Sequence, residues 1–177
     1  ITAVVTVADD GGSSGILRSD LGMLAPGDVR NCVSALAEVD PVMGELLNFR
    51  FKDGSLKGHS LGNLFLAALN ETSSSFDEAV KKFSHLAGVV GTVYPVTNES
   101  VTLSALLEDG RLIEGESHIG VHHDGPKNGI VKLMVNPEKP KAVDGVIKAL
   151  EKADIIVLGP GSLYTSIIPN LLVDGVV

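Results

Sequence analysis

The sequence predicts an α/β domain with an open, mostly parallel β-sheet. Its two strongest predicted strands, residues 2–8 and 154–158, are apolar runs rich in β-branched residues, and each precedes a Gly/Ser-rich loop and a predicted helix. The composition agrees, since 20 glycines and 4% aromatic residues suit tight loops better than an aromatic-rich β-sandwich. Loops at the carboxyl ends of such strands meet at one edge of the sheet, so one pocket built from both loops is expected.

The first half of the chain is predicted to be mainly helical after the first strand. Asp28 is a credible N-cap for a helix from residue 29, and Pro41 suits the first position of the next one. Two acidic residues, Asp77 and Glu78, suit the positive end of a later helix dipole. These signals and the spacing of apolar residues predict a loop at 9–15 and helices at 16–21, 29–38, 41–51, 60–70 and 76–86.

The second half mixes strands, loops and helices. A β-branched run predicts a strand at 89–96, and the pair Asp109-Gly110 predicts a hairpin turn. The polar, histidine-bearing stretch 115–129 is interpreted as a loop. The other predicted elements are strands at 101–107, 111–114, 131–135 and 154–158, helices at 140–152 and from 164, and a loop at 159–162.

The totals exclude several classes of protein. With 14 basic against 22 acidic side chains, the net charge is −8, so the 177 residues carry no basic footprint for nucleic acid. Cys32 is the only cysteine, which excludes an intrachain disulfide and favours the cytoplasm. No apolar run reaches the roughly 18 to 20 residues that span a bilayer. Because the chain begins at Ile1, inside a predicted strand, we expect a single domain over 1–177 that is incomplete at both ends.

The loop at 9–15 carries the first candidate site. Glycines let the backbone approach a ligand, and the loop N–H groups can form an anion-binding nest. Two adjacent carboxylates repel phosphate unless a cation or a sugar hydroxyl intervenes, which points to a phosphorylated or sugar-bearing ligand, with Mg²⁺ as the candidate cation. The alternative is a plain strand-terminating loop with a capping Asp. The candidate ligand-binding residues are Asp9, Asp10, Gly11, Gly12, Ser13 and Ser14.

Two predicted helix N-termini add further candidates. In the first, Asp28 is a candidate metal or hydroxyl ligand and Arg30 a fork for phosphate, with Asn31 beside them; a capping Asp and a solvated Arg are the alternative. In the second, His59 and Asn63 share one helix face, which fits anion or base recognition, whereas a lone His is more often structural. Residues 58–62 also match GxSxG, but no predicted strand precedes them, so a serine hydrolase is rejected.

The second Gly-rich loop also leads into a predicted helix N-terminus. Its backbone N–H groups and hydroxyls would form a phosphate cradle. The candidate ligand-binding residues here are Gly159, Gly161, Ser162, Thr165 and, further along, Asn170. A different group, His118, His122 and His123 with Asp124, is interpreted as surface loop residues rather than a metal cluster, because adjacent histidines fit tetrahedral geometry poorly. Cys32 is interpreted as a small core residue.

Four ordered blocks carry a family resemblance over essentially the whole chain. They are TVADDGGSSG at 6–15, PGDVRN at 26–31, KGHSLGNL at 57–64 and GPGSLYTS at 159–166, and PNLLV at 169–173 continues the match. The sequence resembles the gluconeogenesis factor family (YvcK-like), which is related to the 2-phospho-L-lactate transferases of coenzyme F420 synthesis (CofD-like). The family's initial strand with its Gly-Gly-Gly-Thr-Gly turn is absent before Ile1, and the family's C-terminal portion is absent after Val177.

The resemblance implies a Rossmann-like three-layer sandwich and a cytoplasmic protein that binds a UDP-sugar, usually UDP-N-acetylglucosamine. It also implies a role in cell shape and cell-wall precursor flow during gluconeogenic growth, and a homo-dimer. In the transferase relatives, carboxylates at the positions of Asp10 and Asp28 are associated with Mg²⁺.

We therefore expect a binding or regulatory protein for a nucleotide sugar or another phosphorylated small molecule, with no catalytic residue assigned. The phosphates would lie against the two Gly-rich loops, with Arg30 offsetting their charge. Asp9 or Asp10 would take sugar hydroxyls, and amide contacts would come from Asn63 and Asn170. The alternatives are an Mg²⁺-dependent phospholactyl transferase with a deazaflavin acceptor and, as a weaker reading, a NAD-type dinucleotide protein, against which the absence of GxGxxG counts.

Overall fold

The computed structural model describes residues 1–38, 40–122 and 128–177. It confirms the α/β class with a parallel sheet: β1 (Thr2–Val5) pairs in parallel with β2 (Thr92–Pro95), in a register that sets Thr2 opposite Thr92. The β1 ladder is shorter than the predicted strand. Residues 6–8 continue as a buried segment without strand pairing and lead directly into the loop that begins at Asp9.

Five helices occupy most of the sequence between β1 and β2, as predicted. They are α1 (Gly12–Leu21), α2 (Gly27–Leu36), α3 (Pro41–Asn48), α4 (Leu61–Glu71) and α5 (Phe76–Leu86). Two predicted boundaries are wrong. The helix after the first loop begins at Gly12 rather than at residue 16, so most of the predicted loop is a helix N-terminus. Asp28 is not an N-cap, because α2 begins at Gly27 and Asp28 lies in its first turn.

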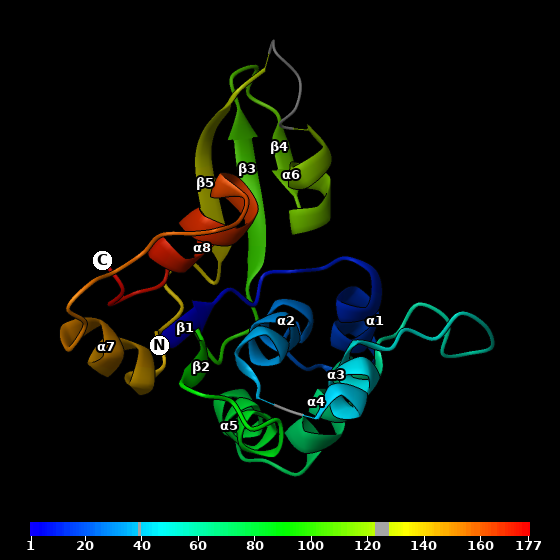
Figure 1. The fold of residues 1–177 in the computed structure, drawn as a ribbon. Coiled ribbons are helices and arrows are strands. Elements are labelled where there is room, and N and C mark those ends of the chain that lie inside the picture. Colours follow the sequence, from blue (N-terminus) through cyan, green and yellow to red (C-terminus); the bar gives the residue numbers. More distant parts are fainter. Residues whose placement is uncertain (39, 123–127) are drawn as a thin grey trace.

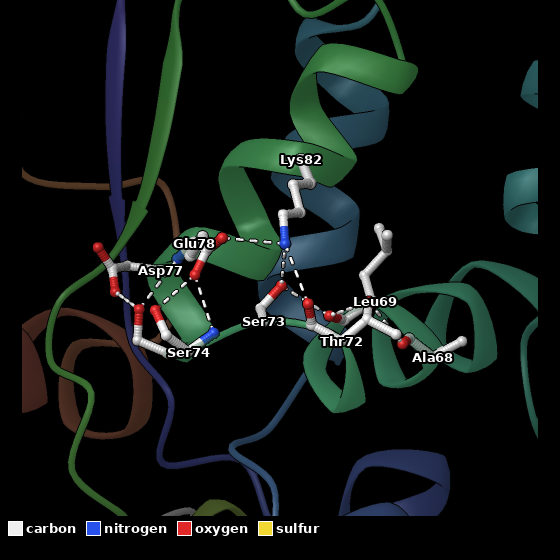
Figure 2. A network of polar contacts seen from close by, with 9 residues as sticks. Ala68, Leu69, Thr72, Ser73, Ser74, Asp77, Glu78 and Lys82 are labelled. Carbon is white, nitrogen blue, oxygen red and sulfur yellow. Dashed lines mark hydrogen bonds and ion pairs between the residues drawn. The ribbon is translucent and has the colours of Figure 1, made fainter.

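Polar side chains fix the connection between α4 and α5 (Figure 2). Ser75 caps α5 by accepting from the backbone N–H of Glu78, and the Glu78 carboxylate accepts from the backbone N–H of Ser74 at 2.8 Å. Lys82 pairs with Glu78 at 2.9 Å and donates to the carbonyl of Thr72. The hydrogen bonds from Ser74 and Lys82 lower the pKa of Glu78 to about 2. This reciprocal capping explains why the acidic first turn of α5 could be predicted from local sequence.

Strands of the second half form an antiparallel sheet that projects away from helices α1–α5 (Figure 1). Strands β3 (Thr102–Leu107), β4 (Leu112–Glu114) and β5 (Ile130–Asn136) are ordered β4-β3-β5, which confirms the predicted hairpin. The predicted loop at 115–129 is wrong in part, because α6 (Glu116–His122) occupies its start. The helix was missed because its N-terminal partner, Asp10, is distant in sequence.

The end of the chain departs furthest from prediction. Helix α7 (Asp144–Glu151) is shorter than expected, and a π-helix η1 (Leu163–Ile167) leads into α8 (Ile168–Leu171). The predicted buried strand at 154–158 is wrong: it pairs with no strand among the described residues, and Ile155 and Val157 are 81% and 76% exposed. An apolar run favours burial, but a strand forms only where a neighbouring backbone supplies hydrogen bonds.

The hydrophobic core lies between the parallel strands and helices α2, α4 and α5. Its fully buried members include Val7, Val29, Leu66 and Phe83, and Cys32 packs against the same cluster, as predicted. Burial of the helix faces fixes where their N-terminal ends lie, and those of α1, α2 and α4 carry the candidate site. None of the helices in the described part of the chain has the length and apolarity to cross a membrane.

Candidate functional site

A cavity of about 250 Å³ lies where the N-terminal ends of α1 and α2 meet. It brings together most of the residues predicted from the first loop and from the two helix starts. A larger cavity of about 810 Å³, between α5, β2 and the start of α7, contains none of the predicted ligand-binding residues. The smaller cavity is lined by Asp9, Gly11, Gly12, Ser13, Ser14, Gly27, Asp28, Arg30, Asn31, Arg50 and Asn63.

Helix α1 presents its open N-terminus to this cavity. The Asp9 carboxylate accepts from the backbone N–H of Gly11 at 2.9 Å, which turns the chain from the end of the first strand into the helix. No side chain caps α1, so the N–H groups of its first turn are left for water or a ligand. Gly12 has φ of +44°, a conformation that favours glycine. The first turn therefore forms a surface that favours negative charge.

Hydrogen bonds connect the predicted residues of α1, α2 and α4. Arg30 donates through Nε to Oδ1 of Asn63 at 3.4 Å, and Nδ2 of Asn63 donates to Oγ of Ser13 at 3.1 Å. Oγ of Ser13 lies 3.0 Å from Nδ1 of His59. All four side chains are buried. His59 does not line the cavity and acts on it through Ser13.

Arg30 is a buried cation without a carboxylate partner. Its side chain is 7% exposed, and among the described residues it forms no ion pair. Burial, and next the charge of Arg50, lower the pKa of its guanidinium, while Asp28 opposes that effect. Nη1 of Arg30 donates to Oδ1 of Asn48, a neutral amide, at 2.8 Å. An incoming anion would supply the negative charge that balances the Arg30 guanidinium.

Arg50 is a site residue that sequence reasoning missed. It lies beyond the end of α3 and forms an isolated antiparallel bridge with Ser60, which brings it beside α2 and α4. Its guanidinium donates to the carbonyl of Gly58. The only local signal was a basic residue close to the Asp53-Gly54 turn, and that signal does not reveal which residue the returning chain meets.

Carboxylates also line the cavity. Burial, and next the charge of Asp9, raise the pKa of Asp28, and Arg30 opposes them. Gly27 permits this close packing, since an added Cβ would lie 2.6 Å from Oγ of Ser14 and 3.0 Å from Oδ2 of Asp9. The cavity is thus lined both by cations, from α2 and residue 50, and by carboxylates, from the first loop and α2.

Asp10 has a different place from its neighbour Asp9. Its two carboxylate oxygens accept from the backbone N–H groups of Glu116 and Ser117, each at 2.9 Å, and it does not line the cavity. Glu116, which sequence reasoning also missed, has its pKa raised by burial and by Asp9, Asp10 and Asp28, against a hydrogen bond with Thr165. The described residues place no three acidic, His or Cys side chains to hold a metal ion, and Mg²⁺ at Asp10 and Asp28 stays a prediction.

The second Gly-rich loop does not line this cavity. Gly159, Gly161 and Ser162 are exposed, and Oγ of Ser162 caps η1 by accepting from the N–H of Thr165 at 3.3 Å. Thr165 is buried and forms a hydrogen bond with Glu116, the residue whose pKa the site carboxylates also raise. Asn170 donates to the carbonyl of Ser166 at 2.9 Å, and its Oδ1 is buried without a partner in the described chain.

The histidines of the second half fall at the edge of what the structure describes. His118 is exposed, and its Nδ1 lies 2.8 Å from the carbonyl of Glu114, which agrees with a surface position, although on α6 rather than in a loop. The side chain of His122, and the whole of His123 and Asp124, lie outside the described residues.

Comparison with known proteins gives consistent matches over nearly the whole chain. The family model of 2-phospho-L-lactate transferase CofD matches residues 1–177. The gluconeogenesis factor of Bacillus subtilis is 48% identical over 98% of this chain, and that of Halalkalibacterium halodurans is 47% identical over 99%; each is covered over 54% of its own length. A crystal structure of a Bacillus halodurans protein superposes with a TM-score of 0.94 at 46% identity, over 99% of this chain and 56% of that one. The chain thus spans about half the length of these relatives.

Proposed function

We propose that this chain, which belongs to the CofD family and resembles bacterial gluconeogenesis factors, binds a nucleotide sugar of the UDP-N-acetylglucosamine type and acts as a regulatory protein. In the whole protein this binding would serve cell shape and cell-wall precursor flow during gluconeogenic growth. The proposal follows from the cavity at the N-termini of α1 and α2, and the relatives' names support its metabolic setting.

The buried, unpaired charge of Arg30 carries the proposal. A buried guanidinium whose hydrogen bonds within the described residues go to neutral amides is costly unless an anion balances its charge. Arg50 adds a second positive charge, and the open N-terminus of α1 adds backbone N–H groups. A diphosphate would meet all three groups, while the carboxylates of Asp9 and Asp28 would accept from sugar hydroxyls.

A second candidate function is phospholactyl transfer to a deazaflavin-type acceptor, favoured by the family model that matches the whole chain. Asp28 supplies a specific observation for it. Burial raises the pKa of this carboxyl, which lies beside the positively charged groups of the candidate anion site. Such a carboxylate is suited to accept a proton from an attacking hydroxyl. Turnover separates the two candidates, since a regulator binds its ligand without consuming it.

The test is calorimetric titration of the full-length protein with UDP-N-acetylglucosamine, with and without Mg²⁺, followed by analysis of the mixture for product. Saturable binding without product supports the regulator. Arg30→Lys should weaken binding by roughly tenfold or more, because lysine cannot reproduce the planar fork. Arg111→Lys is the matched control, since Arg111 lies on the surface in an ion pair with Asp109. Absence of binding at millimolar ligand rejects the proposal and directs the search to phospholactyl donors.

A further inference from the structure

Ser13 and His59 form a buried pair that ligand binding alone does not explain. Oγ of Ser13 and Nδ1 of His59 lie 3.0 Å apart, although the residues are 46 positions apart in sequence. The two side chains are 6% and 8% exposed. Ser60, the serine of the GxSxG match, has a structural role instead, because its Oγ caps α4 by accepting from the N–H of Asn63 at 3.2 Å.

The hydrogen-bond chain fixes the orientation of the Asn63 amide. A guanidinium only donates, so the amide must turn its Oδ1 to Arg30 and its Nδ2 to Ser13. Oγ of Ser13 thus accepts from Asn63, and in the His59 tautomer that carries its proton on Nε2, the Ser13 hydroxyl donates to Nδ1 of His59. A hydroxyl that accepts from an amide and donates to an imidazole has the arrangement of a nucleophile with its general base.

The position of the pair leaves room for a reacting group in the cavity beside Ser13. Ser13 lines the 250 Å³ cavity, whereas His59 lies behind it, on the side away from an incoming ligand. The N–H groups of the first turn of α1 and the guanidiniums of Arg30 and Arg50 surround the same space. These donors would stabilise negative charge on a phosphoryl group that is attacked by Ser13.

We propose that Ser13 is a nucleophile that accepts a phosphoryl group, with His59 as its general base. Oγ of Ser13 forms a bond to phosphorus, the bond from phosphorus to the leaving oxygen breaks with its electron pair, and the hydroxyl proton passes to Nδ1 of His59. Attack on phosphorus by water or an acceptor hydroxyl then releases Ser13, whose oxygen takes the proton back from His59. The proton of the attacking water or hydroxyl passes to solvent, which protonates the first leaving oxygen. The inference rests on the anion site of the proposed function, and because it requires turnover it extends the second candidate, group transfer, rather than a regulator that leaves its ligand unchanged.

The test uses p-nitrophenyl phosphate as donor to the full-length protein. We expect a burst of p-nitrophenolate that approaches one equivalent per chain, and a phosphoryl adduct that peptide mass spectrometry locates on Ser13. His59→Gln should slow the burst by about 10²- to 10⁴-fold while preserving the fold, because the general base is lost. Ser13→Ala should abolish the adduct. Ser34→Ala is the control for a buried serine hydroxyl, since Ser34 lies on α2 and does not line the cavity.

If the alanine variant fails to fold, Ser13→Cys takes its place in the test. We expect the phosphoryl adduct of this variant to be an acid-labile phosphocysteine at the same position. Absence of any adduct on residue 13 of the wild-type protein, or a burst that His59→Gln leaves unchanged, overturns the inference. Calorimetry with pyrophosphate on the same sample separates the two proposals: binding without an adduct rejects only the nucleophile, and absence of both also counts against the anion site.

Discussion

Asp10 caps a helix that begins 106 residues later in the chain: its Oδ2 accepts from the backbone N–H of Glu116 at 2.9 Å, and its Oδ1 accepts from Ser117. Gly115 makes the approach possible, because it has φ of +95° and an added Cβ would lie 2.7 Å from Oδ2 of Asp10. The Asp10 carboxylate therefore connects the loop after the first strand to the antiparallel sheet region, and Arg18 adds a second connection through the carbonyls of Asp9 and Val101.

Replacement of Asp10 should destabilise the domain through this cap. We expect Asp10→Ala to lower the free energy of unfolding by about 1 to 2 kcal/mol, because two backbone N–H groups lose a charged acceptor. Asp20→Ala, an exposed aspartate at the end of α1, should change it by less than about 0.5 kcal/mol. Urea titration of both variants measures the difference. Equal stability of the two variants would show that the cap contributes nothing.

The raised pKa of Asp28 predicts a pH dependence of stability with a definite sign. Because the folded-state pKa lies above the ordinary value of 3.8, the folded protein binds more protons than the unfolded chain between the two values. Stability conferred by the protonated carboxyl is lost as pH rises through this window. Asp28→Asn should therefore raise the melting temperature at neutral pH and leave it unchanged near pH 3.

Thermal unfolding across this pH range checks the prediction, with Asp53→Asn in the exposed turn after α3 as the control. The same Asp28 variant should bind the sugar ligand more weakly, as expected where a functional site is held at a cost in stability. A melting temperature of Asp28→Asn below that of the wild type at neutral pH would contradict the prediction.

Gly62 should not tolerate a side chain. An added Cβ would lie 2.5 Å from the carbonyl oxygen of Leu47 and 2.9 Å from Cγ and Cδ of Arg30. We expect Gly62→Ala to lower the free energy of unfolding by about 1 to 3 kcal/mol, the usual range for overpacking, and to weaken anion binding because Arg30 is displaced. Gly120→Ala on α6, where the added methyl meets nothing within 4 Å, should be neutral or stabilising.

Thermal unfolding and calorimetric titration of the two glycine variants give both readouts. A Gly62→Ala protein with wild-type stability and affinity would mean that α4 shifts without moving Arg30.

Removal of the α4 cap should loosen the hydrogen-bond chain of the site. Ser60 is fully buried and accepts from the N–H of Asn63, the residue that connects Arg30 to Ser13. Ser60→Ala should lower the free energy of unfolding by about 1 kcal/mol, and Ser55→Ala, at an exposed position in the preceding turn, should not. Hydrogen exchange of the α4 N-terminus should increase only in the Ser60 variant; unchanged exchange would contradict the proposed coupling.

Elements encoded by local signals could be predicted well. The turn at Asp109-Gly110, the acidic first turn of α5, and the change from buried segment to loop at Asp9 depend on residues within a few positions of one another. The candidate site was likewise predictable where its residues lie together in one short motif. Asp9, residues 11–14, Asp28, Arg30, Asn31 and Asn63 do line one cavity, because each group lies at or beside a helix N-terminus, whereas Asp10 does not line it.

The sequence by itself therefore determined the α/β class, most helices and the polar groups at their N-termini. Only the tertiary structure decided that Arg50 joins Arg30, that Asp10 starts α6 and that Ser13 meets His59. It also decided that residues 154–158 stay exposed. The physical reason is that helix caps and turns are local equilibria of the backbone, whereas an unpaired buried charge, a long-range cap and a strand pairing depend on which distant segment packs beside them.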